Sequence, residues 1–166
     1  MDQVSLIEPN GGEHIDLGPI QIRILEGGDT TQHRLAVGEI TIPAHTPGPP
    51  QHRHSGHDEG FYVVSGLARF QVGDLSYDAP AGTFVMVPPG APHGFGNPSD
   101  ATTVLLNTFT PDLYVQYFRD LGDFIAKDRP MTPEAMIDIM SRYATTPATE
   151  FSPAARTADF RPPNIL

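Results

Sequence analysis

The sequence contains no cysteine, and Lys127 is its only lysine. Without cysteine, the chain has no disulfide, no thiolate metal ligand and no cysteine nucleophile, and this composition suits a reducing cytoplasm. Positive charge is also scarce, because ten Lys and Arg residues stand against twenty Asp and Glu residues, for a formal net charge of −10. An acidic surface repels phosphate backbones and anionic lipid headgroups, which argues against nucleic acid and polyphosphorylated substrates as partners.

Long apolar runs are missing as well. No run approaches the roughly 20 residues that a membrane-spanning helix needs. The opening segment, MDQVSLIEPNGGEHI, lacks the basic cluster and the apolar core of a signal peptide. We therefore expect a cytoplasmic protein with no membrane partner. The 166 residues suit one domain with a single hydrophobic core.

Eighteen prolines and sixteen glycines interrupt the chain without a fixed period. This composition is typical of short strands joined by tight turns rather than of a helical bundle. Apolar residues alternate or run in short lengths, which predicts strands at residues 20–24, 35–42, 61–64, 67–72, 83–87 and 102–109. The Ser65-Gly66 turn makes the third and fourth of these strands a candidate hairpin. Together they predict a β-sandwich or barrel.

The apolar period changes after residue 109. Apolar residues recur at helical spacing over 113–125 and again over 136–143. Thr110-Pro111 and Thr132-Pro133 precede these runs, and a threonine cap followed by proline is a helix start signal. The last residues are rich in Thr, Pro, Ala and Ser, which predicts an extended tail. The expected organisation is a barrel over 1–110, a helical segment over 111–144 and a tail over 145–166.

Four potential metal ligands lie in two stretches of the barrel region. His52 and His54 are two residues apart, so in a strand they share one face. Glu59 follows a short turn and starts the next strand, and His93 follows the tight turn at residues 88–90. Three imidazoles and one carboxylate suit a divalent first-row metal with positions left open for water or substrate. Fe, Mn, Ni, Co and Zn all accept these ligands, so the metal itself is not predicted.

These two stretches resemble the two sequence motifs of the cupin superfamily. His-x-His, four residues, Glu, six residues and Gly match over 52–66, and the second motif matches over 82–97. Thr46 departs from the pattern, because a glycine usually stands six residues before the first histidine. The resemblance covers residues 15–110. It implies an all-β cupin double-stranded β-helix, a jelly-roll barrel with one divalent metal per chain, here followed by two C-terminal helices.

Strand alternation predicts which residues surround the metal. If Glu59 faces inward, Phe61 and Val63 on the same strand do so too, while Tyr62 and Val64 face outward. Tyr114 and Tyr117 are expected at the mouth of the barrel, where the helical segment would control access without supplying ligands. The predicted substrate-binding residues are Phe61, Val63, Met86, Phe95, Tyr114 and Tyr117. This lining suits a small, mainly uncharged, aromatic or enolisable substrate and argues against a sugar-phosphate isomerase.

The remaining histidines are expected to have no part in the metal site. His57 is expected at the surface or behind the ligands, and His14, His33 and His45 are expected to face solvent. Asn97 is expected to brace the end of a strand.

Within the superfamily, residues 48–54 and 58–66 resemble small bacterial monocupins similar to quercetin dioxygenases. This resemblance implies an oxidoreductase that adds oxygen to an electron-rich carbon, with Glu59 as ligand and proton acceptor. Two alternatives stay open, because a fold does not fix a function. One is a non-oxidative, metal-dependent lyase, isomerase or decarboxylase, and the other is a metal-containing ligand-binding module without turnover. Exposed Tyr62 and Val64 and the proline-rich tail predict a homodimer.

Overall fold

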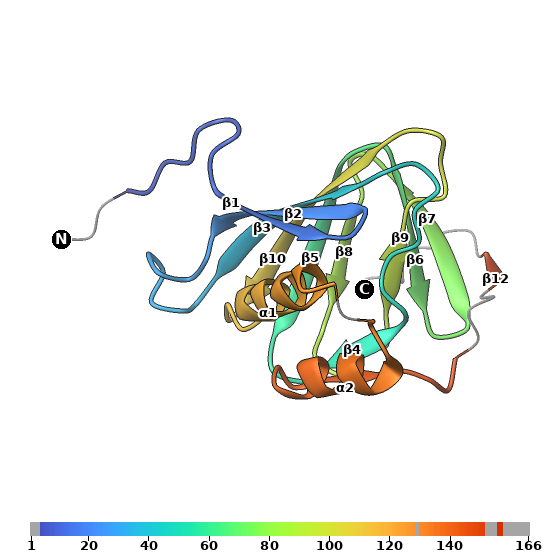
Figure 1. Ribbon diagram of the computed structural model, residues 1–166. Helices are drawn as coiled ribbons and strands as arrows, with labels where there is room; N and C mark the ends of the chain where they lie inside the picture. The colour runs from blue at the N-terminus through green and yellow to red at the C-terminus, as the bar shows by residue number, and fades with distance from the viewer. Residues whose placement is uncertain (1–3, 129, 152–155, 158–166) are drawn as a thin grey trace, which may run out of the picture.

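The computed structural model describes residues 4–128, 130–151 and 156–157, which form two main β-sheets and two helices (Figure 1). The larger sheet contains, in spatial order, β1 (Glu13–Leu17), β2 (Ile20–Glu26), β3 (Ala36–Ile42), β10 (Thr103–Thr110), β5 (Asp58–Ser65) and β8 (Phe84–Val87). The smaller sheet contains β12 (Arg156–Thr157), β7 (Leu75–Pro80), β6 (Leu67–Val72) and β9 (Gly94–Gly96). A two-stranded sheet joins β4 (His52–His54) to β11 (Thr145–Pro147). The strands confirm the predicted all-β jelly-roll barrel.

The hydrophobic core lies on the inward faces of these strands. In β3 and β10 buried positions alternate with partly buried ones, as the two-residue period of a strand requires. In β5, Phe61 and Val63 are completely buried, whereas Tyr62 and Val64 are 44% and 48% exposed, as predicted. The ring of Phe61 lies 5.3 Å from that of Phe70 in β6, so aromatic contacts join the two sheets.

The predicted hairpin of residues 61–64 and 67–72 is not formed. β5 pairs with β10 and β8, whereas β6 pairs with β7 and β9, so the chain passes from one sheet to the other at Gly66. Gly66 has a φ of 80°, and a Cβ there would lie 2.6 Å from Thr103 Oγ1, so the position requires glycine. The turn was predicted correctly, but a turn does not determine which strands pair. The hairpin in this region joins β6 to β7 through Gly73-Asp74.

Helices α1 (Val115–Ala126) and α2 (Pro133–Ser141) confirm the two predicted C-terminal helices. Thr132 caps α2 as expected, because its side chain accepts a hydrogen bond from the Ala135 backbone N–H. Thr110-Pro111 is not a helix start. Thr110 ends β10, and α1 begins at Val115 after a turn, without a side-chain cap. Neither helix of the described chain is long and apolar enough to cross a membrane.

The helices pack their apolar stripes on the barrel. α1 contacts β1, and its residues Tyr117, Phe118 and Leu121 belong to the buried core. α2 contacts β11, which continues the chain along β4. Residues 152–155 and 158–166 of the predicted tail lie outside the described residues, and the proposed division of the chain at 110 and 144 stays a prediction.

Candidate metal centre

His54, Glu59 and His93 meet inside the barrel although they lie on three separate segments. His54 ends β4, and Glu59 is the second residue of β5. His93 precedes β9 and is held against β4 by two backbone hydrogen bonds with His52, of 2.9 and 3.0 Å. The three side chains are at most 4% exposed, and one potential ligand atom from each lies within 4.8 Å of the others. Their arrangement can hold a metal ion.

One carboxylate oxygen, Oε2 of Glu59, is the point where two imidazoles converge. His54 Nε2 lies 2.9 Å and His93 Nε2 3.1 Å from it. The opposite ring nitrogens each contact a backbone carbonyl, His54 Nδ1 that of His57 at 3.2 Å and His93 Nδ1 that of Ala91 at 3.1 Å. A carbonyl only accepts, so each Nδ1 donates and a neutral ring keeps its lone pair on Nε2.

Two lone pairs that face one carboxylate oxygen repel it unless a positive charge lies among them. That charge is either a proton on an imidazole or a metal cation, and imidazole and carboxylate are ligands that first-row divalent metals accept. The carbonyls that hold the Nδ1 atoms are the kind of partner that metal-bound histidines have. The donor set of His54, Glu59 and His93 therefore fits a divalent metal.

His52, the fourth predicted ligand, lies beside this group. Its ring centroid is 4.4 Å from that of His93 and 6.2 Å from that of His54, and the three-residue group does not include it. Its Nδ1 donates to the Pro50 carbonyl at 3.0 Å, so Nε2 again keeps the lone pair. Burial, followed by the charge of His93, lowers the pKa of His52 to about 4, so the ring is neutral at pH 7. Its role as a ligand stays a prediction.

Glu59 is ionised in this environment. Burial raises the pKa of its carboxyl, but an imidazolium at His54 or His93, which also carries a proton on Nε2, donates to Oε2 and holds the pKa well below its usual range. The second carboxylate oxygen, Oε1, accepts a hydrogen bond of 3.1 Å from Asn107 Nδ2. Motif spacing did not reveal Asn107. The one signal in the sequence is an amide residue between Leu105 and Phe109, at an inward position of β10.

His57 is buried, so the expectation of a surface position is wrong. The residue is only 1% exposed, and its ring stacks on that of His54 with centroids 3.9 Å apart. The ring of Tyr114 lies 4.7 Å away on α1's side of the site. Both ring nitrogens of His57 lack a hydrogen-bond partner among the described residues, and burial lowers its pKa to about 4. Of the two expected placements, the one behind the ligands is correct.

The walls of the site are mainly aromatic and aliphatic. Phe61 lies between His93 and the partly buried Phe95, with centroid distances of 6.4 and 5.2 Å. Met86 is 57% exposed on the outer face of β8, which corrects its prediction as a pocket residue. Because Glu59 pairs with Val87, the register turns Val87 inward and Met86 outward.

Tyr114 and Tyr117 cover the side of the site nearest α1. Tyr114 is 3% exposed, and its ring lies 5.7 Å from that of His54. Tyr117 is 7% exposed and stacks on Tyr114 with centroids 4.5 Å apart. Thr145, at the start of β11, donates to the Tyr114 hydroxyl at 3.3 Å. The two predicted mouth residues thus lie beside the site, packed between α1 and β11.

Outside the site, the other expectations for polar residues are confirmed. His14, His33 and His45 are exposed. Asn97 is buried and donates to the carbonyls of Ile42, Pro43 and Ala101, so it braces the strand ends as predicted.

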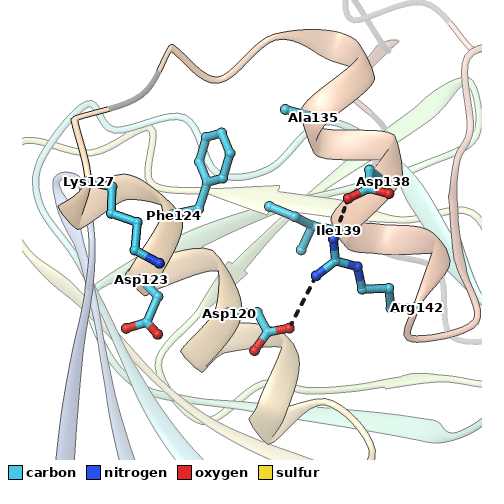
Figure 2. A pocket seen from close by; sticks show the side chains of 8 residues that line it. All are labelled: Asp120, Asp123, Phe124, Lys127, Ala135, Asp138, Ile139 and Arg142. Atoms are coloured by element: carbon cyan, nitrogen blue, oxygen red, sulfur yellow. Dashed lines mark hydrogen bonds and ion pairs between the residues drawn. The ribbon is translucent and has the colours of Figure 1, made fainter.

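A separate cavity of about 370 Å³ lies between α1 and α2 (Figure 2). Charged side chains dominate it, and Arg142 bridges Asp138 on its own helix and Asp120 on α1. Its lining residues are Asp120, Asp123, Phe124, Lys127, Ala135, Asp138, Ile139 and Arg142. None of the candidate ligands lies there, so this cavity is distinct from the metal centre.

The comparisons with known proteins identify the fold. The family described as Cupin domain matches residues 38–109. KdgF from Halomonas sp. is similar with a TM-score of 0.58 and 19% identity, over 66% of this chain and 94% of that one. The polyketide cyclase RemF from Streptomyces resistomycificus is similar with a TM-score of 0.58 and 17% identity, over 65% and 80% of the two chains. A putative sugar phosphate isomerase from Acidithiobacillus ferrooxidans gives a TM-score of 0.50 and 26% identity, over 60% and 67%. No curated protein matches the sequence.

Proposed function

We propose that this protein is a metal-dependent enzyme of the cupin superfamily, because the family described as Cupin domain matches residues 38–109 and the strands form a jelly-roll barrel. Its reaction is the dioxygenation of a small, mainly uncharged, aromatic or enolisable substrate. The observation that carries the metal dependence is the convergence of two imidazole Nε2 atoms on Oε2 of Glu59. No other arrangement of His, Asp and Glu side chains in the described chain offers such a buried donor set.

The proposed ligands are His52, His54, Glu59 and His93. A divalent metal held by them supplies Lewis-acid character and a template for a substrate hydroxyl or enolate and for oxygen. Glu59 is ionised at neutral pH but weakly basic, so we assign it the proton of a substrate hydroxyl whose pKa a bound divalent metal would lower.

The residues around the centre favour a neutral substrate. Phe61, which contacts His93, and Phe95, which contacts Phe61, provide apolar walls, and Tyr114 and Tyr117 provide planar aromatic surface on the α1 side. Val63 is buried further along β5. In the contacts described above, the proposed metal ligands touch histidine, aromatic and amide side chains and backbone carbonyls. A phosphate group needs cationic partners, which supports an aromatic or enolisable substrate over a sugar phosphate. We assign Tyr114 and Tyr117 the role of admitting substrate, because both must move for a ligand to reach His54 from the helical side.

Metal content is the first test of this proposal. Protein purified from unsupplemented cells is expected to carry close to one divalent metal per chain, as measured by elemental analysis. His52→Ala and His93→Ala should each lose most of it, because each removes one of only four ligands. His45→Ala is the matched control, since His45 is exposed and pairs with Asp100 on the surface. Metal content unchanged in both ligand variants would rule out the site.

Oxygen uptake is the second test. The metal-loaded protein is expected to consume oxygen with a flavonol or an enolisable diketone in an electrode-based screen. Turnover without oxygen consumption would favour the lyase, isomerase or decarboxylase alternative. Binding without any turnover would favour the ligand-binding module.

A further inference from the structure

Asn107 is an amide side chain placed between two large apolar side chains. It lies on the inward face of β10 between Leu105 and Phe109, and all three residues are completely buried. A buried amide destabilises a protein by a few kcal/mol unless hydrogen bonds compensate the lost contact with water. Leucine has nearly the same shape and would fit the row without that cost, so the amide calls for an explanation.

Both donors of the Asn107 amide contact β5. Nδ2 donates to Oε1 of Glu59 and to the Gly60 carbonyl, each at 3.1 Å. Because both partners are acceptors only, the orientation of the amide is fixed, since a flipped amide would place its own oxygen against two others. Oδ1 of Asn107 has no hydrogen-bond partner among the described residues. The amide is therefore only half satisfied, and the half that is satisfied holds Glu59.

The two carboxylate oxygens of Glu59 have different partners. Oε1 of Glu59 is held by Asn107, while Oε2 faces the Nε2 atoms of His54 and His93. We propose that Asn107 is a positioning residue, which fixes Glu59 as a ligand through Oε2 alone and so keeps a coordination position open for substrate. This inference rests on the proposed metal site.

A purely structural asparagine in this chain looks different. Asn97 is also buried, but its amide bonds only to backbone carbonyls and to Ser99, and it touches no ligand. Asn107 instead shares its donors between one carbonyl and a ligand carboxylate. Asn97 is therefore a control for the loss of a buried amide as such.

Titration with Co²⁺ tests the proposal on the full-length protein. Asn107→Leu is expected to raise the Kd for Co²⁺ about 10- to 100-fold, the usual effect of removing a partner that orients a metal ligand. It should also weaken the visible absorption of bound Co²⁺, because a Glu59 carboxylate released from Asn107 can bind through both oxygens and raise the coordination number. Asn107→Val, which suits a strand and also lacks the donor, should behave alike and replaces the leucine variant if that one does not fold. Asn97→Ala should lower the Tm but leave the Kd and the spectrum unchanged.

The outcomes separate this inference from the proposed function. A wild-type protein that binds no Co²⁺ overturns both. A wild-type protein that binds Co²⁺, with folded Asn107 variants that keep its Kd and its spectrum, overturns the positioning role alone. A lower Tm in the Asn107 variants with unchanged metal binding has the same meaning, because it shows only a structural contribution.

Discussion

At the scale of single residues, Glu59 has the most demanding position, because both of its oxygens have specific partners. Glu59→Gln keeps the size of the side chain but removes its charge and its basicity. We expect metal affinity to fall moderately and turnover to fall by about 10²- to 10⁴-fold, the range for a lost general base. Metal titration and steady-state kinetics with a substrate from the oxygen-uptake screen measure the two effects.

The matched control for this substitution is Glu39→Gln. It makes the same chemical change at a partly exposed glutamate that pairs with Arg23 and is not one of the proposed ligands. It should leave both quantities unchanged. Full activity in Glu59→Gln would show that the carboxylate has no catalytic part.

For His57, in contrast, we expect a substitution to stabilise the protein. Its buried ring nitrogens lack hydrogen-bond partners in the part of the chain that the structure describes, and an unsatisfied buried polar group costs about 1–3 kcal/mol. His57→Leu, with a similar volume, is therefore expected to increase the free energy of unfolding of the metal-free protein, as measured by urea denaturation. His14→Leu, at an exposed histidine of β1, is the comparison for a surface change. A less stable His57→Leu variant would show that the imidazole is held by interactions worth more than its burial costs.

At the scale of elements, β11 connects the C-terminal segment to the ligand strand. Thr145 pairs with His54 and Pro147 with His52, and the Ala148 N–H donates to the Gln51 carbonyl at 2.9 Å. A helical segment that controls access without supplying ligands could be removed after Lys127 with the metal still bound. Such a truncation also removes β11, the partner of β4, so we expect it to weaken metal binding.

A substitution in β11 tests this link without deleting the helices. Thr146→Pro removes a backbone N–H from the strand and is expected to weaken metal affinity, because proline disrupts strand pairing and β4 carries two proposed ligands. Thr146→Ala keeps the backbone donor and should bind metal like the wild type, since the Thr146 side chain is exposed. Equal affinities in the two variants, measured by metal titration, would show that β4 holds its geometry without β11.

At the scale of the whole molecule, an apolar patch on the outer face of β5 and β8 predicts a homodimer. The patch consists of Tyr62, Val64, Phe84 and Met86, each 44–57% exposed, and β8 is an edge strand of the larger sheet. Contiguous exposed apolar surface of this kind marks interaction sites. Light scattering is expected to give twice the chain mass, and Phe84→Lys should produce monomers.

Val72→Lys is the control for that change, because Val72 is 40% exposed on the other sheet. A wild-type monomer across micromolar concentrations would contradict the dimer. The cytoplasmic location likewise stays a prediction, which fractionation of cells can check.

Several features of this protein follow from the sequence alone because they depend on local geometry. A strand has a period of two, so His52 and His54 come from one short strand and Phe61 turns inward while Tyr62 turns outward. The cap of α2 at Thr132 is equally local, because the hydroxyl and the amide that it accepts from are three residues apart.

Tertiary structure decided the features that depend on which distant segments meet. The run at 84–87 is apolar at consecutive positions, so alternation could not tell that Met86 faces outward, and only the pairing of β8 with β5 set its face. The turn at Gly66 was predicted correctly, but only the tertiary structure shows that the chain passes there from the larger sheet to the smaller one. Asn107 holds Glu59 across 48 residues of sequence. The ring of His57 lies against those of His54, Phe109 and Tyr114, and two of these come from segments more than 50 residues away. Local patterns determine how a side chain points along its own strand, whereas its partners are set by the packing of the whole chain.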